Sequence, residues 1–179
     1  LWTEDHVNFS GKFYQLEDAS IAPRPVQHPM PLWIGGSAPQ AVERTARWAT
    51  GWQAGLETPE EVAPVISAIK TALPRFGRTI DEDHYGAGFA FRFGSPEEPV
   101  CRRNDELLAK RLGKDPGRLR AIGGAEEILS LLADFRNAGV HKFILRPIAT
   151  DSADLMTQTE RLIDDVLPEV RALNAANGA

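Results

Sequence analysis

The hydrophobic and polar positions of this chain follow two alternating periods. Short apolar runs, which are typical of strands, are each followed by a longer segment whose apolar residues recur every three or four positions. Because strand and helix alternate without a hairpin signal between them, the pattern predicts βαβ units and a parallel sheet. The strands predicted in this way are 32–34, 51–55, 84–94 and 140–148.

Helix boundaries follow from turn and capping residues. Ser37 with Gln40, and Thr58 with Glu61, form capping-box patterns at the starts of two helices. The predicted helices cover about 38–49, 58–74, part of 105–120, 125–138 and 153–173, with a loop at 95–104 and a kink or break at Pro168. The inward face of the last helix is predicted to carry Leu155, Thr159, Leu162, Ile163, Val166, Val170 and Leu173.

The segment 84–94 alternates small residues with aromatic ones. Tyr85 and Phe89 lie on one parity, whereas the glycines and Arg92 lie on the other. One face is therefore expected to pack against helices and the other to meet a crowded interior. Arg92 has two interpretations: an ion pair with an acidic neighbour at the strand end, or contact with an anionic substrate or cofactor group. The segment 140–148 is a near-continuous apolar run and is predicted to be a strand buried on both faces.

Four strand and helix pairs allow two architectures. A right-handed crossover between parallel strands places every helix on the outer side if the sheet curls. The count then fits half of an eight-stranded α/β barrel. A small doubly wound sheet is the alternative.

The first 28 residues differ from the βα units that are predicted over 29–179. They combine three aromatic residues, a turn at Ser10 and Gly11, and two prolines, and they predict a long connection with a small hairpin. Such a connection can be a functional lid or an aromatic-pinned surface loop. Because the chain starts without methionine inside this connection, we expect a fragment of a longer protein.

Composition narrows the classes of partner. The chain has 179 residues, 42% hydrophobic and 25% charged, which fits one globular unit, and its net charge of -5 argues against a DNA or RNA partner. The apolar runs are too short to span a membrane, and no secretory pattern is present, so we expect a cytoplasmic protein. One cysteine excludes an internal disulfide, and the scattered histidines predict no metal site.

A glycine turn joins the first predicted strand to its helix. Gly35 and Gly36 allow a sharp bend, and the free N–H groups at the start of the helix can bind an anion such as a phosphate. The alternative is a tight connection without a ligand. The tryptophans at 2, 33, 48 and 52 are interpreted most simply as core residues.

Several motifs in order resemble a known family. They are FSGKFYQL, APRPVQHPMPLWIGG, AVERTARWATGW and RAIGGAEEILSLLADFRNAGVHKFIL. Together they resemble the C-terminal half of bacterial luciferase-like flavin-dependent oxidoreductases, over nearly the whole chain. The resemblance implies a (β/α)8 TIM-barrel fold of which the chain covers about the last four βα units. It also implies a cofactor, either reduced FMN or an 8-hydroxy-5-deazaflavin.

The resemblance assigns roles to particular residues. Gly35, Gly36, Ser37 and Ala38 would hold the cofactor phosphate or ribityl chain through backbone N–H groups. At the C-terminal mouth of the barrel, Trp52, Arg92 and Arg146 become candidate contacts of the substrate or of an anionic group. The family helix commonly ends in Ala-Asp-Gly-Trp, but Thr50 stands at the acidic position here. No catalytic acid or base is identified, because the first four strands would supply the usual candidates.

The function expected from the resemblance is a flavin-dependent monooxygenase. It would use reduced FMN and molecular oxygen on a small organic substrate, with a flavin reductase as partner and a homo-oligomeric state. One alternative is a deazaflavin-dependent dehydrogenase or reductase that transfers hydride. Another is a truncated, non-catalytic flavin-binding half barrel that dimerises to bury its open sheet edges. A flavodoxin-like binding domain is a further alternative.

Overall fold

The computed structural model describes residues 1–113 and 115–176, and its backbone contacts divide the chain into two units. The first unit, Leu1–Leu32, contains an antiparallel hairpin of β1 (Val7–Ser10) and β2 (Gln15–Ala19), which confirms the predicted small hairpin. The second unit, Trp33–Ala179, contains the sheet and all the α-helices. That the first unit acts as a lid stays a prediction.

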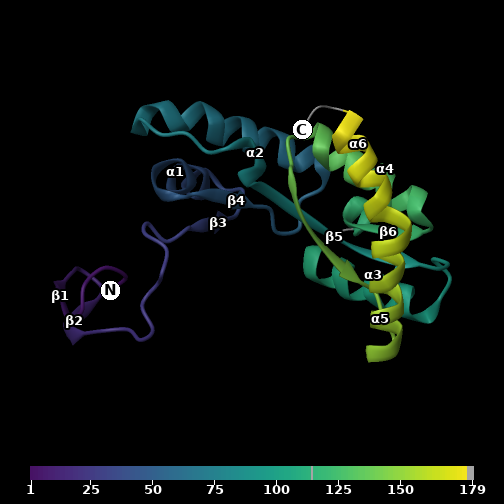
Figure 1. Ribbon diagram of the computed structural model, residues 1–179, viewed down its shortest axis with the longest axis horizontal. Coiled ribbons are helices and arrows are strands. Elements are labelled where there is room, and N and C mark those ends of the chain that lie inside the picture. The colour runs from purple at the N-terminus through teal and green to yellow at the C-terminus, as the bar shows by residue number, and fades with distance from the viewer. Residues whose placement is uncertain (114, 177–179) are drawn as a thin grey trace. The chain divides into compact units, whose positions relative to one another are not determined.

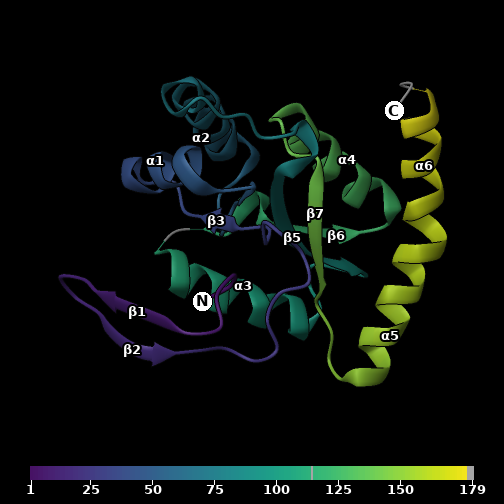
Figure 2. The same ribbon diagram turned by 60° about the vertical axis from the view of Figure 1, so that its left-hand side comes forward.

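The second unit is built on a parallel sheet of five strands (Figures 1 and 2). The alternation of strands and helices predicted from the sequence is confirmed, but one strand was missed, since the Arg120–Gly123 strand is short and carries a charge. The strands are β3 (Trp33–Gly35), β4 (Gly51–Gln53), β5 (Tyr85–Phe93), β6 (Arg120–Gly123) and β7 (Lys142–Pro147).

Strand β5 is shared by three neighbours. The carbonyl of Gly86 accepts a hydrogen bond from Ala54 N–H after β4, and the carbonyl of Phe91 accepts one from Ile148 N–H after β7. Because residues of opposite parity direct their backbone groups to opposite edges of a strand, β4 and β7 lie on opposite sides of β5. The N–H of Gly94 has the parity of Gly86 and donates to β6. Strand β6 therefore continues the edge that β4 begins.

Helices follow the strands and lie on both faces of the sheet. The helices are α1 (Pro39–Trp48), α2 (Pro59–Ala72), α3 (Pro99–Leu112), α4 (Ala125–Asn137), α5 (Ser152–Arg161) and α6 (Leu167–Ala176). Short 3-10 turns cover Leu73–Phe76, Glu82–His84 and Gly117–Leu119, and a π turn covers Leu162–Val166. At the start of α2, the Glu61 carboxylate accepts from the N–H of Thr58, as the capping-box pattern predicted.

One helix-packed face was predicted for β5, and the structure shows that it is the aromatic one. Phe89 is fully buried and stacks on Phe135 of α4, with ring centroids 5.9 Å apart. Apolar residues of α2 and α4 complete the same core, which includes Val62, Ile66, Ile69, Ile128 and Leu131. Burial of these side chains fixes which face of the sheet is covered and leaves the opposite parity for the site.

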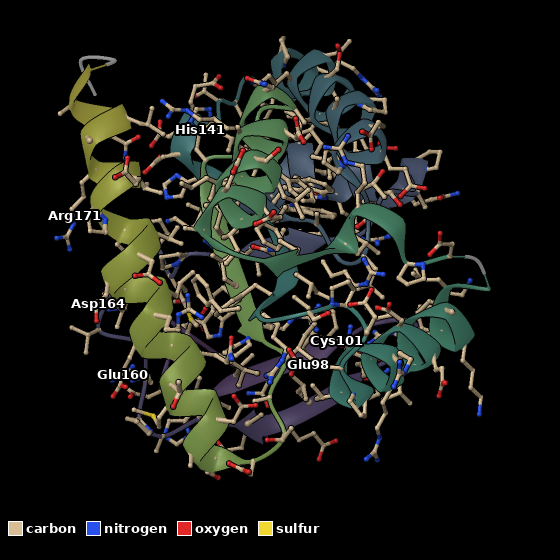
Figure 3. The ribbon with its side chains drawn as sticks, turned by 90° about the vertical axis from the view of Figure 1, so that its right-hand side faces the viewer. Glu98, Cys101, His141, Glu160, Asp164 and Arg171 are labelled. Carbon is tan, nitrogen blue, oxygen red and sulfur yellow. The ribbon has the colours of Figure 1, made fainter. Side chains whose placement is uncertain are left out.

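Helix α3 packs on the opposite parity. It begins at Pro99, so the loop predicted over 95–104 is wrong in its second half; proline is favoured in a first helical turn, where its missing N–H costs nothing. Cys101 of α3 is buried against Ala90 of β5 and Ile148 after β7. Figure 3 shows Cys101 and Glu98 next to each other at the start of this helix.

Strand β7 is not buried on both faces, contrary to the prediction. Phe143 and Leu145 pack against the helical core, but Ile144 between them is 54% exposed. Among the described residues, β7 pairs only with β5, and β3 pairs only with β4. An apolar run can therefore belong to a strand whose second face is open, because hydrophobicity does not report which neighbour covers each face.

The C-terminal helical segment breaks before Pro168, as predicted. Leu167 N–H bonds to the carbonyl of Leu162, five residues back, which is the π-turn pattern. Proline cannot donate the next backbone bond, so the break satisfies the chain around it. The inward face was partly wrong. Val166 is buried and Leu162 and Val170 pack on the core, but Leu155, Ile163 and Leu173 are exposed and Gln158 is buried instead.

The tryptophans divide between core and surface. Trp52 is fully buried and Trp33 is half-buried, but Trp2 and Trp48 are 43% and 55% exposed, so their prediction as core residues is wrong. Trp48 packs its ring under the guanidinium of Arg47 instead. An amphipathic ring at a helix end can satisfy its apolar surface against a neighbouring cation without entering the core.

A buried arginine ties together the ends of β5 and β7 and the starts of α3 and α5. Arg92 donates to Glu98 from Nε and Nη2, at 2.9 and 2.7 Å, and from Nη1 to Asp154 at 2.8 Å. The same Nη1 reaches the carbonyl of Ile148 at 2.8 Å. Gln158 accepts from the N–H of Phe93 at 2.7 Å. We call Arg92, Glu98, Asp154 and Gln158 the Arg92 network.

The network shifts the pKa values of its members in opposite directions. The N–H of Thr150 and then the Arg92 guanidinium lower the pKa of Asp154 to about 2. Hydrogen bonding to Arg92, followed by the N–H of Ser95, lowers the pKa of Glu98. The pKa of Arg92 is raised, chiefly by its hydrogen bonds to Glu98. All three groups are therefore charged at neutral pH.

Replacing Gly88 by alanine should destabilise the protein. A Cβ at this position would overlap the backbone carbonyl oxygen of Ile144 on β7, so the two strands would have to shift. We expect Gly88→Ala to lower the free energy of unfolding by about 1–3 kcal/mol in urea denaturation. Gly55→Ala is the control, because its Cβ would make an ordinary contact with Glu57. Equal stability of the two variants would contradict the close approach of β5 and β7.

Replacing Asp154 by asparagine should reduce stability in a pH-dependent way. The carboxylate has a lowered folded-state pKa, so its contribution is present above the ordinary pKa of 3.8 and is lost as the pH falls towards 2. At pH 7 we expect Asp154→Asn to cost about 1–3 kcal/mol of unfolding free energy, and the difference should shrink below pH 4. Asp164→Asn, at an exposed position of the C-terminal segment (Figure 3), should show neither effect. A pH-independent loss would show that charge is not the cause.

Candidate functional site

The candidate site lies where the parallel strands end. In register, Gly35 at the end of β3 lies beside Gln53 at the end of β4. Farther along the sheet, Phe93 lies beside Gly123, and Phe91 beside Pro147. The carboxyl ends of strands in α/β sheets and barrels are where ligands bind, because the loops that follow them are free to vary.

The glycine turn after β3 has the backbone shape that only glycine adopts readily. Gly36 has φ of +97°, and a Cβ there would lie 3.2 Å from the Cβ of Ala41. Helix α1 starts at Pro39 with Ala38 as its N-cap, and no side chain caps it, so the prediction that Ser37 is the N-cap is wrong. The reason is that the chain stays extended for one more residue, with ψ of 151° at Ala38.

Trp52 holds this turn from beneath. Its indole Nε1–H donates to the carbonyl of Gly36 at 3.0 Å, and the side chain is fully buried in the helical core. A residue without exposed surface supports the turn through this hydrogen bond. That Trp52 contacts substrate stays a prediction. Its ring lies in the core on the helix-covered side of the sheet.

Arg92 lies at the same end of the sheet, but its guanidinium is occupied. Glu98 and Asp154 both neutralise it, and the side chain is 9% exposed. This arrangement is the ion-pair interpretation of Arg92, and it involves two acidic residues that are distant in sequence from each other. The sequence could indicate an acidic neighbour at Glu98, six residues away, but gave no signal for Asp154.

Arg146 faces a small cavity on the open side of the sheet. The cavity, about 230 Å³, is lined by Gln53–Leu56 after β4, Gly88 of β5, Ile144 and Arg146 of β7, and Arg111 of α3. Within the described residues, neither arginine forms a hydrogen bond or ion pair with a side chain. Sequence analysis missed Arg111 because the segment that carries it was treated as a solvated face. We call this space the Arg111–Arg146 cavity.

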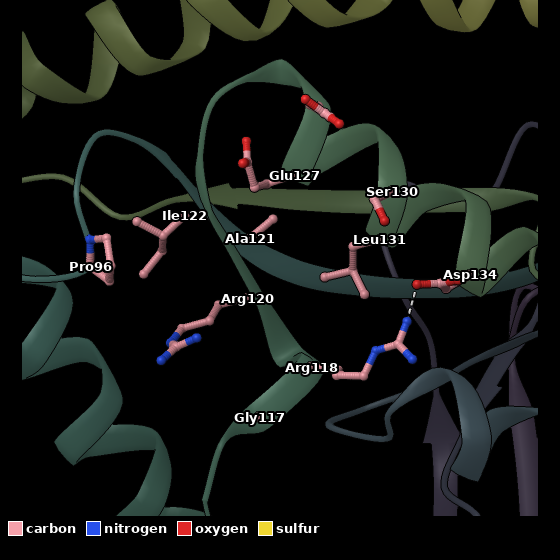
Figure 4. A pocket seen from close by; sticks show the side chains of 11 residues that line it. Pro96, Gly117, Arg118, Arg120, Ala121, Ile122, Glu127, Ser130, Leu131 and Asp134 are labelled. Carbon is pink, nitrogen blue, oxygen red and sulfur yellow. Dashed lines mark hydrogen bonds and ion pairs between the residues drawn. The ribbon is translucent and has the colours of Figure 1, made fainter.

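A larger cavity, about 760 Å³, lies between β6 and α4 (Figure 4). Both of its arginines are already paired: Arg118 bonds to Asp134 and to Glu60, and Arg120 bonds to Asp105. Figure 4 shows Arg118 reaching towards Asp134 at one side of the space. Paired charges have little remaining capacity for an ionic ligand, so this cavity is a weaker candidate than the one beside Arg146.

Acidic and histidine groups gather at one further place. Asp81, Asp83 and His84 offer ligand atoms within 4.8 Å of one another, before the start of β5. The two carboxylates are exposed, and exposed acidic groups are commonly solvated without an ion, so the absence of a metal site stays a prediction. Within residues 1–113 and 115–176, no helix is both long and apolar enough to cross a membrane.

Solved structures with the same fold are luciferase-like TIM-barrel enzymes. An F420-dependent secondary alcohol dehydrogenase superposes with a TM-score of 0.71 at 17% identity, over 94% of this chain and 57% of that one. A monooxygenase from Streptomyces bottropensis superposes with a TM-score of 0.70 at 18% identity, with the same coverage. The barrel-type α/β fold class is therefore confirmed, and the chain corresponds to a part of such a barrel.

Sequence comparison also finds F420-dependent dehydrogenases. An F420-dependent glucose-6-phosphate dehydrogenase of Amycolatopsis mediterranei is 28% identical over 97% of this chain and 58% of that protein. A second, from Kineococcus radiotolerans, is 24% identical over 96% of this chain and 57% of that protein. The chain thus spans less than two thirds of these relatives.

The family model for luciferase-like monooxygenases matches residues 1–112, which is more than half of the chain. The matched part contains the glycine turn, Trp52 and Arg92. The members of this family that match the chain are flavin- or F420-dependent oxidoreductases and monooxygenases. The chain belongs to the luciferase-like monooxygenase family.

Proposed function

We propose that the protein to which this chain belongs is a deazaflavin-dependent oxidoreductase that transfers hydride between its cofactor and a small organic substrate. The observation that carries the proposal is the match to an F420-dependent glucose-6-phosphate dehydrogenase along 97% of the chain. The sequence alone favoured FMN. The named F420-dependent relatives now favour the deazaflavin.

The glycine turn fits the cofactor's phosphate or ribityl chain. Gly36 adopts a left-handed φ and lies within contact distance of α1, so the backbone comes close to any group held there. The turn Gly35–Ala38 precedes α1, whose first N–H groups and dipole favour an anion. Trp52 would keep the turn in place through its bond to Gly36. The bound deazaflavin itself supplies the hydride chemistry.

The Arg92 network would support the mouth of this site without touching the ligand. It links the ends of β5 and β7 to the starts of α3 and α5, so the ends of the loops at the mouth are held in place. Arg92 would then act by positioning these loops. Arg146, whose guanidinium faces a cavity, is the stronger candidate for ligand contact.

A monooxygenase that uses reduced FMN and oxygen is the second candidate. The family model that matches residues 1–112 is described as a luciferase-like monooxygenase. A flavin reductase would be the partner of such an enzyme. A homo-oligomer is also proposed for either candidate. In a half barrel, it would cover the edges of β3 and β7 that are unpaired among the described residues.

Cofactor titration tests the proposal. The protein expressed from its complete reading frame is titrated with F420 and with FMN, each oxidised and reduced, and binding is followed by absorbance. We expect F420 to bind at least tenfold more tightly than FMN. Tighter binding of FMN, with oxygen-dependent oxidation of its reduced form, would favour the monooxygenase. Binding of neither cofactor would contradict both candidates.

The glycine turn has a matched control. Gly36→Ala places a methyl group at a positive φ against Ala41, and we expect it to weaken cofactor binding at least tenfold. Gly77→Ala introduces comparable backbone strain, at φ of +62°, where nothing lies within 4 Å of the new methyl. It should lose similar stability but keep cofactor affinity. Equal affinity of both variants would contradict the assignment of the turn to the cofactor.

A further inference from the structure

We propose that the Arg111–Arg146 cavity binds a phosphate ester group through its two guanidinium side chains. This inference rests on the proposed function in one respect, namely that the cavity belongs to the active-site mouth. The two arginines come from different elements: Arg111 from the last turn of α3 and Arg146 from β7. The fold brings them to one cavity of about 230 Å³ beside the end of β4.

Other arginines of the sheet region already have partners. Arg92 is neutralised by two carboxylates, Arg120 by Asp105, and Arg78 donates to three backbone carbonyls at the end of α1. The Arg111–Arg146 cavity is different, because its lining contains two guanidinium groups and no carboxylate. Two like charges that share a cavity repel each other, and an anion bound between them offsets this repulsion.

The acidic residue that follows the cavity lining in sequence bonds to the backbone and not to either arginine. Glu57 follows Leu56 of the cavity lining, but its carboxylate accepts from the N–H of Gly55 at 2.6 Å. The last turn of α3 favours a cation through the helix dipole, so Arg111 can keep its charge there without a carboxylate partner. The cavity is therefore a local positive site on a chain with a net charge of -5.

The chemistry of the lining selects a phosphate among anions. A guanidinium presents parallel N–H donors that match two oxygens of a phosphate, and two such groups suit its double charge. The amide side chain of Gln53 adds a polar group at the end of β4. Gly88 carries no side chain into the cavity, and Ile144 supplies an apolar surface for the carbon atoms of an ester. The phosphate could belong to the substrate or to the cofactor.

The test is an isothermal titration of the complete protein with inorganic phosphate, in which calorimetry measures binding. We expect saturable binding, weakened about tenfold by Arg111→Gln or Arg146→Gln and about a hundredfold by both. Arg171→Gln is the matched control, since Arg171 is charged but lies on the outer side of α6 (Figure 3). It should leave phosphate binding unchanged. Both cavity arginines are exposed, so their replacement should not disturb the core.

The outcomes separate this inference from the proposed function. No saturation by phosphate below about 10 mM, or an equal loss in Arg171→Gln, would overturn the inference while leaving cofactor titration to stand. Phosphate binding that needs both arginines, without F420 binding, would support the inference and contradict the proposed function. Repeating the titration at saturating F420 identifies the source: displacement assigns the phosphate to the cofactor, and simultaneous binding assigns it to the substrate.

Discussion

The buried guanidinium of Arg92 is the constraint around which the mouth of this fold is arranged. A charge that is 9% exposed is tolerated only when carboxylates and carbonyls satisfy it, and here they come from three places along the chain. Glu98 starts α3, Ile148 follows β7, and Asp154 lies in the first turn of α5. Because each partner is held by the same group, the loops that leave β5 and β7 cannot move independently. The ion pairs thus hold the segments that follow β5 and β7 in fixed positions at the carboxyl end of the sheet.

The second constraint is the unequal use of the two faces of β5. Its aromatic parity fills the core under α2 and α4, while its small parity allows β7 to approach closely and leaves space beside Gly88. Large side chains on the second parity would fill the region where Arg111 and Arg146 now face one cavity. Dense packing of the aromatic parity and the open space beside Gly88 are therefore parts of one arrangement, which supplies both stability and a cavity.

The family relationship and the local chemistry bear on different questions. Membership of the luciferase-like family supports the proposed cofactor-dependent oxidoreductase, and the solved structures support the barrel-type fold. They do not account for the paired arginines, which follow from where α3 ends and how β7 lies against β5. The glycine turn with Trp52 beneath it suits a cofactor group, whereas the arginine pair suits a separate or adjoining phosphate.

The sequence by itself determined the alternation of strands and helices, the parallel sheet, the two unlike faces of β5, the break before Pro168 and the family. These properties depend on periodicity, proline positions and motif order, which can be read from the sequence without knowledge of contacts between distant residues. Tertiary structure alone decided that Ala38 and not Ser37 caps α1, that Arg120–Gly123 forms a strand, and that Ile144 is exposed. It also decided the partners of Arg92, and the meeting of Arg111 with Arg146. Contacts between residues tens of positions apart depend on register and crossover geometry, and no local pattern encodes either.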